Sequence, residues 1–227
     1  MEPPFDAWLA PLLQCNDSAY PVGAFAHSFG LEGMVQTGAV TDRVSLLAFL
    51  HGPVRHGLAK VDLPLLAHAY EAAKGENVGE LVRLDHLSAA CRAPSELREA
   101  ATRVGRQRLE MLDSVWAQHL KVPELDLPHK QAPIVAGIEA RVLGAPKRSA
   151  MLAYAHGSYA AILSAAIKLL RLGQTAVQQM LMKCSRTLGV LIQTAEQTSL
   201  DDVGSFAPLL DTSSMRHERC AARLFLS

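Results

Sequence analysis

The sequence predicts an all-α fold, a single-domain helical bundle of roughly eight to ten helices. Apolar residues recur at spacings of three and four along the chain, while the period-two alternation typical of strands is almost absent. Hydrophobic residues make up 49% of the 227 residues and charged residues 19%, a balance typical of a globular protein with a buried core. We therefore expect residues 1–227 to form one domain, with 204–227 as a partner-binding C-terminal tail.

Local signals place the individual helices. Apolar spacing predicts helices over residues 5–13, 28–37, 43–73, 95–116, 134–143, 148–172 and 177–195. The third is expected to begin after an N-cap at Asp42 and to kink at Gly52-Pro53, because proline cannot donate a backbone hydrogen bond. Ser95 is expected to cap the fourth helix. Three prolines within 121–133 predict an internal loop before the fifth.

Charge and hydropathy exclude several classes of partner and location. Lys plus Arg number 22, as do Asp plus Glu, so we expect no nucleic acid and no anionic membrane as partner. The N-terminal sequence MEPPFDAWLAPLL has no basic region before an apolar core, which favours a cytoplasmic protein over a secreted one. The most apolar run, from Met151, is interrupted by His156, Gly157 and Lys168, which predicts a buried helix rather than a membrane span.

Common signatures of metal and nucleotide chemistry are missing. The four cysteines are dispersed without a C-x-x-C pair, which favours reduced thiols. LGAPKRS at 143–149 lacks the phosphate-binding frame G-x-x-x-x-G-K-[ST], and HERCA has Ala221 where H-E-x-x-H needs its second histidine. His217 and Cys220, three residues apart, make at most a weak, transient metal site. We therefore expect no tightly bound cofactor.

One apolar helix carries a polar seam. Ser164, Lys168 and Arg171, spaced by four and three residues, are expected to line one face of the helix predicted over 148–172. In one interpretation Lys168 lays its aliphatic stem over apolar surface and sends its ammonium group to water. In the other it lies in an interface or in a polar passage between helices.

Two further stretches are unusual for a helical protein. PVGAFAHSFGLEGMVQTG, residues 21–38, places several glycines beside His27 and Glu32. Because glycine has no side chain, another backbone can approach these positions closely. The approach could occur at a partner surface or an ion path, or it could serve turns and helix packing within one subunit. SMRHERCAARLFLS, residues 214–227, sets three arginines among apolar residues and is too short for a stable isolated helix. It either docks on its own domain or folds on a partner.

Four blocks of the sequence together resemble the UreF family of urease accessory proteins. They are LLQCNDSAYPVGAFAHSFGLEGMVQTGAV, PSELREAATRVGRQRLEML, LSAAIKLLRLGQTAVQQML and SMRHERCAARLFLS, and they occur in the order of the family. The resemblance implies an all-α, noncatalytic homodimer in the cytoplasm that binds the accessory protein UreD, also called UreH, and the GTPase UreG. The complex is expected to deliver nickel to the urease apoenzyme, so nickel would be handled only transiently.

The resemblance leaves the mechanism of this coupling open. The chain could link the nucleotide state of UreG to nickel release and pass the ion toward UreD, or it could activate the GTPase directly. A different class of function also stays open from the residues alone: a helical metal-dependent hydrolase assembled from scattered His and Glu residues.

Matching the family blocks position by position gives a set of candidate residues for partner binding or an ion route. They are Pro21, Gly23, His27, Ser28, Gly30, Glu32, Lys168, Gln174, Arg216, His217, Glu218, Arg223 and Phe225. Cys220 and Ala221 interrupt the tail block with residues that the family pattern does not explain, which leaves a metal role of the Cys220 thiol in doubt.

Overall fold

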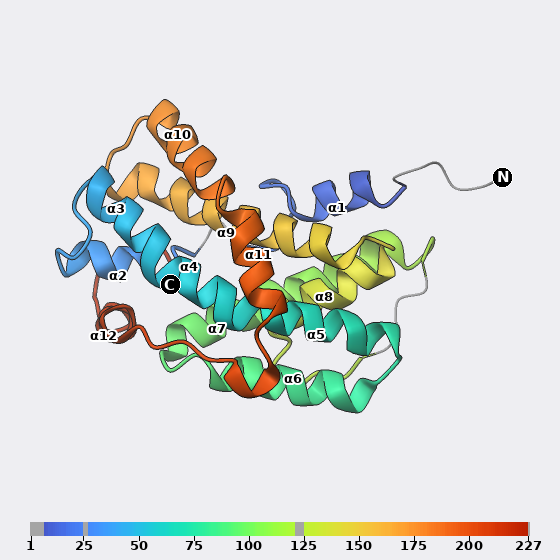
Figure 1. The fold of residues 1–227 in the computed structure, drawn as a ribbon. Coiled ribbons are helices and arrows are strands. Elements are labelled where there is room, and N and C mark those ends of the chain that lie inside the picture. The colour runs from blue at the N-terminus through green and yellow to red at the C-terminus, as the bar shows by residue number, and fades with distance from the viewer. Residues whose placement is uncertain (1–6, 25–26, 121–124, 227) are drawn as a thin grey trace.

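The structure is a computed structural model that describes residues 7–24, 27–120 and 125–226, and in these residues it is all-α without a strand (Figure 1). The predicted fold class is confirmed. The helices are α1 (Leu9–Cys15), α2 (Leu31–Gln36), α3 (Arg43–Phe49), α4 (Arg55–Gly57), α5 (Leu63–Lys74), α6 (Val78–Ala90), α7 (Ser95–Met111), α8 (Ala132–Val142), α9 (Lys147–Leu169), α10 (Gln174–Ser185), α11 (Leu188–Glu196) and α12 (Pro208–His217).

Some of these helices run into one another. The π-helical turns Leu50–Val54 and Leu58–Asp62 join α3, α4 and α5 into one kinked helix, and Leu112–Trp116 extends α7 in the same way. Counted like this, the described part of the chain has ten helices, within the predicted range, besides a short 3₁₀ turn at Leu200–Asp202.

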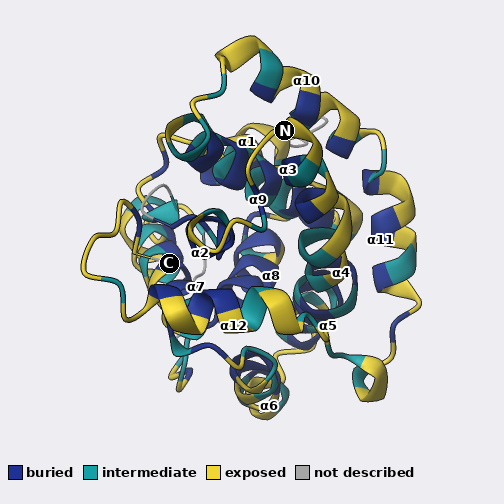
Figure 2. Cartoon of the chain, turned by 90° about the vertical axis from the view of Figure 1, so that its left-hand side faces the viewer, coloured by how far each residue is buried: buried dark blue, intermediate teal, exposed yellow. Residues whose placement is uncertain are grey.

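Helix α8 lies at the centre of the bundle, where Figure 2 shows it as buried. All residues from 131 to 140 are buried, because this segment is apolar apart from Gln131 and Glu139. Helices α5 and α7 pack against α8, and α9 crosses it with α10 and α11 on its outer side. The N-terminal residues of α2 and the C-terminal helix α12 meet at one end of this core.

A buried ion pair joins three helices in this core. Arg108 of α7 pairs with Glu139 of α8, and both side chains are enclosed. The guanidinium group also donates to the carbonyl oxygen of Cys15 at 3.1 Å and to Asn16 Oδ1 at 2.9 Å, at the end of α1. Burial raises the pKa of Glu139 and the charge of Arg108 opposes that rise. Arg108 therefore holds the end of α1 to the core.

The predicted start and kink of the third helix are confirmed. Asp42 Oδ1 accepts hydrogen bonds from the backbone amides of Val44 and Ser45, at 2.9 and 2.8 Å, as an N-cap residue does. Gly52 has non-helical backbone angles (φ −93°, ψ −106°) directly before Pro53, so the chain bends there.

The expected cap at Ser95 is wrong. Pro94 occupies the N-cap position, and Ser95 is the first helical residue of α7. Its hydroxyl donates instead to Glu218 Oε2 at 2.8 Å, in the C-terminal tail. A long-range partner has replaced the local cap.

The single helix expected over 177–195 is also wrong. The structure breaks it between α10 and α11, where the Thr187 hydroxyl donates to the Cys184 carbonyl oxygen at 2.8 Å. A hydroxyl bound to a carbonyl of the preceding turn competes with the helical ladder, so the chain turns here.

Helix α9 is the one helix of the described residues whose length and composition would suit a membrane span. Its most apolar 18 residues have a mean hydropathy of 1.3, and 44% of them are buried inside the protein, among them Tyr159 and Leu163. The helix ends at Leu169, and Arg171 follows with a left-handed φ of 50°. Because Arg171 lies beyond the helix end, it cannot belong to the predicted seam of Ser164 and Lys168.

Candidate functional site

The glycine-bearing N-terminal block and the C-terminal tail form one contact. Gly33 of α2 lies directly under α12, where a Cβ atom would be 2.7 Å from the carbonyl oxygen of Ser213. Gly30 precedes α2 with φ 85°, and a Cβ atom there would be 2.5 Å from Leu210 Cδ1. The predicted close approach of another backbone therefore occurs, and the approaching backbone is that of the same chain.

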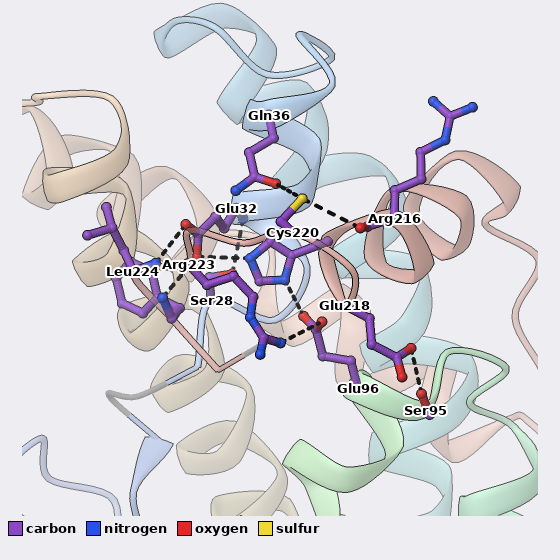
Figure 3. Close-up of polar contacts among 12 residues, drawn as sticks. Ser28, Glu32, Gln36, Ser95, Glu96, Arg216, Glu218, Cys220, Arg223 and Leu224 are labelled. Carbon is purple, nitrogen blue, oxygen red and sulfur yellow. Dashed lines mark hydrogen bonds and ion pairs between the residues drawn. The ribbon is translucent and has the colours of Figure 1, made fainter.

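Next to this contact, three titratable side chains form a buried carboxylate–histidine cluster, defined here as Glu32, Glu96 and His217 (Figure 3). His217 Nε2 lies 3.1 Å from Glu32 Oε2, and His217 Nδ1 lies 2.6 Å from Glu96 Oε1. A carboxylate only accepts hydrogen bonds, so His217 donates from Nδ1 to Glu96. Its Nε2 approaches Glu32 within ion-pair distance. Burial raises the pKa of Glu96, while the hydrogen bond from His217 lowers it.

Glu32 also fixes the last described residues of the tail. Its two carboxylate oxygens accept hydrogen bonds from the backbone amides of Leu224 and Phe225, each at 2.9 Å. Its own backbone amide donates to Ser28 Oγ at 3.0 Å. Phe225 is buried in the main hydrophobic core, and Lys168 Nζ lies 5.8 Å from the centre of its ring. One carboxylate thus holds both the histidine at the end of α12 and the extended segment after it.

Weaker contacts surround the cluster. Arg223 Nη1 lies 4.0 Å from Glu96 Oε2, and Cys220 Sγ lies 3.2 Å from Gln36 Oε1 (Figure 3). Arg216 points away from the cluster, as the same figure shows. The polar groups nearest α2 and α7 therefore hold the tail, and its outer side faces solvent.

The structure brings most of the predicted residues together and leaves some apart. Ser28, Gly30, Glu32, His217, Glu218, Arg223 and Phe225 lie at the tail contact, and Lys168 joins them through the Phe225 ring. Pro21 is exposed in a turn, and Gly23 packs against Gln107 with φ 73°. Gln174 is the exposed first residue of α10.

Glu96 and Ser95 are the functional residues that sequence reasoning missed. Both stand at the start of α7 and reach the tail, Glu96 through His217 and Ser95 through Glu218. Both residues lie in the block PSELREAATRVGRQRLEML, which the family resemblance had already singled out. Nothing in the block itself indicates a partner more than a hundred residues away.

The weak metal candidates His217 and Cys220 each have a partner of their own. Both ring nitrogens of His217 face carboxylates, and the Cys220 thiol contacts Gln36 and the carbonyl oxygen of Arg216. Among the residues that the structure describes, no three His, Cys, Asp or Glu side chains form a group that could hold a metal ion. The cluster is arranged for holding a polypeptide segment.

The burial of His27, in the N-terminal block, predicts that the stability of the protein depends on pH. Its side chain is 2% exposed, and burial, with a smaller contribution from Arg103, lowers its pKa from 6.5 to about 4. As the pH falls, His27 is protonated in the unfolded chain before it is protonated in the folded chain. Its contribution to stability is therefore fully present above the unfolded pKa and is lost as the pH falls below it. We expect the free energy of unfolding to fall by roughly 2 kcal/mol from this group between about pH 7 and pH 5.

Urea denaturation across this pH range measures the effect. The His27→Gln variant cannot titrate there and should show a shallower decline than the wild-type chain. Parallel pH profiles for the two proteins would contradict the assignment to His27.

The chain is an all-α bundle whose buried polar cluster holds the segment that follows α12. The family model UreF matches residues 40–185. Urease accessory protein UreF of Granulibacter bethesdensis (strain ATCC BAA-1260 / CGDNIH1) is 33% identical over 225 residues, covering 98% of this chain and 95% of that protein. The protein of the same name from Trichodesmium erythraeum (strain IMS101) is 32% identical over 219 residues, covering 94% of each.

The chain therefore belongs to the UreF family, as the resemblance of its blocks predicted. Its relatives are named accessory proteins of urease, so this chain is an accessory protein and not an enzyme. The alternative of a helical metal-dependent hydrolase is set aside by this membership.

Proposed function

We propose that this chain is a nickel-insertion chaperone that bridges UreD/UreH and the GTPase UreG and delivers nickel to the urease apoenzyme. In this proposal it works as a homodimer in the cytoplasm, couples the nucleotide state of UreG to metal release, and handles nickel as a transient cargo. Membership of the UreF family supports the urease context of the proposal.

The exposed side of the docked tail is the observation that supports the proposed binding of partner proteins. Leu224 is 70% exposed, and Met215 and Leu226 are also exposed large apolar side chains. Arg216 and Arg219 are exposed beside them. Apolar side chains next to arginines are typical of protein interfaces, and the tail backbone below them is fixed by Glu32. A fixed segment loses less conformational entropy on binding than a disordered one.

The proposed homodimer has a separate support. More than half of the most apolar stretch of α9 is not buried, and Leu152 of this helix is 49% exposed. A second copy of the chain could cover such a surface, as symmetric partners do in most homo-oligomers. Light scattering tests this: a monomer mass at micromolar concentration would contradict the dimer.

A capture experiment tests the proposed partners. The tagged chain is mixed with purified UreD, with and without UreG, and bound proteins are measured after washing. We expect stoichiometric capture of UreD, and capture of UreG in the presence of UreD. If neither protein is retained while the chain is folded, the bridging function is wrong.

Urease activity in cells tests whether Lys168 belongs to the proposed partner surface. Lys168 is an exposed residue whose ammonium nitrogen lies 5.8 Å from the centre of the Phe225 ring, and a cation–π contact at an exposed site contributes about 0.5–1 kcal/mol. Lys168→Ala should therefore retain the fold but lower urease activity in cells several-fold, if this side chain belongs to the partner surface. Lys183→Ala, another exposed lysine near a helix end, is the matched control. Wild-type urease activity with Lys168→Ala would leave Lys168 as a surface side chain over apolar neighbours.

A further inference from the structure

A pair of histidines lies at the surface, one on α6 and one in the segment before α8. His86 of α6 and His129, in the segment before α8, have Nδ1 and Nε2 3.1 Å apart. Their rings meet edge to face with centroids 5.0 Å apart. His86 is exposed and His129 is partly exposed, so both can reach solvent ions.

The buried carboxylate of Asp85 fixes this geometry. Asp85 accepts hydrogen bonds from the backbone amides of His129, Lys130 and Gln131, at 2.6, 3.0 and 2.7 Å. Lys130 has a left-handed φ of 53°, which turns the chain around the carboxylate. Since His86 directly follows Asp85 on α6, the same anchor that holds His129 also sets its distance from His86.

We infer that His86 and His129 form a binding site for one divalent transition-metal ion of borderline softness. Imidazole nitrogen is a preferred ligand of such ions, whereas Mg²⁺ prefers oxygen. Two metal–nitrogen bonds of about 2.1 Å at right angles place the nitrogens about 3.0 Å apart, close to the observed separation. The pair therefore has the spacing of two neighbouring ligands of one ion.

A bound ion would take the place of the hydrogen bond between the two rings. The hydrogen bond between the rings uses an N–H group of one and a lone pair of the other. An ion in its place takes a lone pair from His86 Nδ1 and another from His129 Nε2, and the remaining nitrogen of each ring keeps its proton. Rotation of the exposed His86 ring changes the direction of its own lone pair, so that it can point at an ion bound to His129 Nε2. Water completes the coordination sphere, so we expect binding in the micromolar range or weaker.

Isothermal titration of the full-length, tag-free chain with NiCl₂ tests the site. We expect one Ni²⁺ per chain, and His86→Ala or His129→Ala should each weaken binding by about tenfold or more. Mg²⁺ should give no saturable signal. The matched control replaces both His51 and His56, which are exposed, and should bind Ni²⁺ as the wild type does.

The result separates the site from a simple hydrogen-bonded pair. Circular dichroism checks the fold, and neither substitution removes the backbone amide that Asp85 binds. Broadening of the His86 and His129 imidazole signals by Ni²⁺ in NMR spectra would support the site directly. Absence of saturable Ni²⁺ binding, or binding unchanged in both single variants, would overturn it. The test uses the chain and the metal alone, so it does not depend on the proposed partners.

Discussion

Replacing Arg108 with Ala is expected to lower the free energy of unfolding by about 3–5 kcal/mol. The substitution leaves Glu139 buried without its ion-pair partner, and it removes the donors to Cys15 and Asn16. An unpaired buried carboxylate loses its hydration without compensation. Urea denaturation of wild type and variant measures the loss, and Arg106→Ala, an exposed arginine of the same helix, should change stability by no more than about 0.5 kcal/mol.

A double variant distinguishes a lost ion pair from lost packing. Arg108→Met with Glu139→Leu removes both charges and keeps apolar volume, so it should be more stable than Arg108→Ala. A double variant that is as unstable as the single one would show that the hydrogen bonds to the end of α1 matter more than the unpaired charge. An Arg108→Ala variant within about 1 kcal/mol of wild type would contradict the role of the pair altogether.

The helices that the sequence predicted best are those with local signals. Asp42 caps its helix through amides two and three residues away, and Gly52-Pro53 bends the backbone wherever it stands. Helix α6 was not predicted, although Asn77 caps it through the Glu80 amide at 3.1 Å. Its apolar face is narrow, since only part of each turn packs against the core. The break at Thr187 depends on one side-chain hydrogen bond that competes with an apolar repeat.

The contacts of the candidate site could not be predicted from neighbouring residues in the sequence. Glu32 and His217 were both selected from the sequence, and the bare backbone near Glu32 was expected to meet another backbone. Nothing in either block indicates that they meet each other, because the contact spans nearly the whole chain. Glu96 was missed for the same reason: its partner is fixed by how α7 and α12 pack, and not by its neighbours in sequence.

Replacing Glu32 with Ala is expected to release the tail and to reduce capture of UreD by more than about tenfold, if the proposed function holds. The Glu32 carboxylate accepts the amides of Leu224 and Phe225 and faces His217. Hydrogen bonds to a charged group contribute about 1.5–3 kcal/mol each, so their loss outweighs the few contacts that hold this short segment. Phe225 would then leave its position in the core.

Hydrogen exchange and capture together test this expectation. The amides of Leu224 and Phe225 should exchange faster in Glu32→Ala, while those of α8 keep their protection. Arg223→Ala is the informative comparison, since the contact of this partly exposed side chain with Glu96 is long, at 4.0 Å. It should lose capture of UreD with the tail still docked. Deleting residues 214–227 is a less specific test, because Ser214, His217 and Phe225 are buried and their removal also damages the core.

The pattern of the two variants decides what the tail does. If Glu32→Ala releases the tail and loses capture while Arg223→Ala loses capture alone, the docked tail is the surface that UreD recognises. If Glu32→Ala releases the tail and UreD is captured at the wild-type level, recognition does not need the docked form, and Glu32 serves only the fold. Unchanged exchange at Leu224 and Phe225 in Glu32→Ala would contradict the anchoring role of this carboxylate, since its two hydrogen bonds to those amides are what the substitution removes.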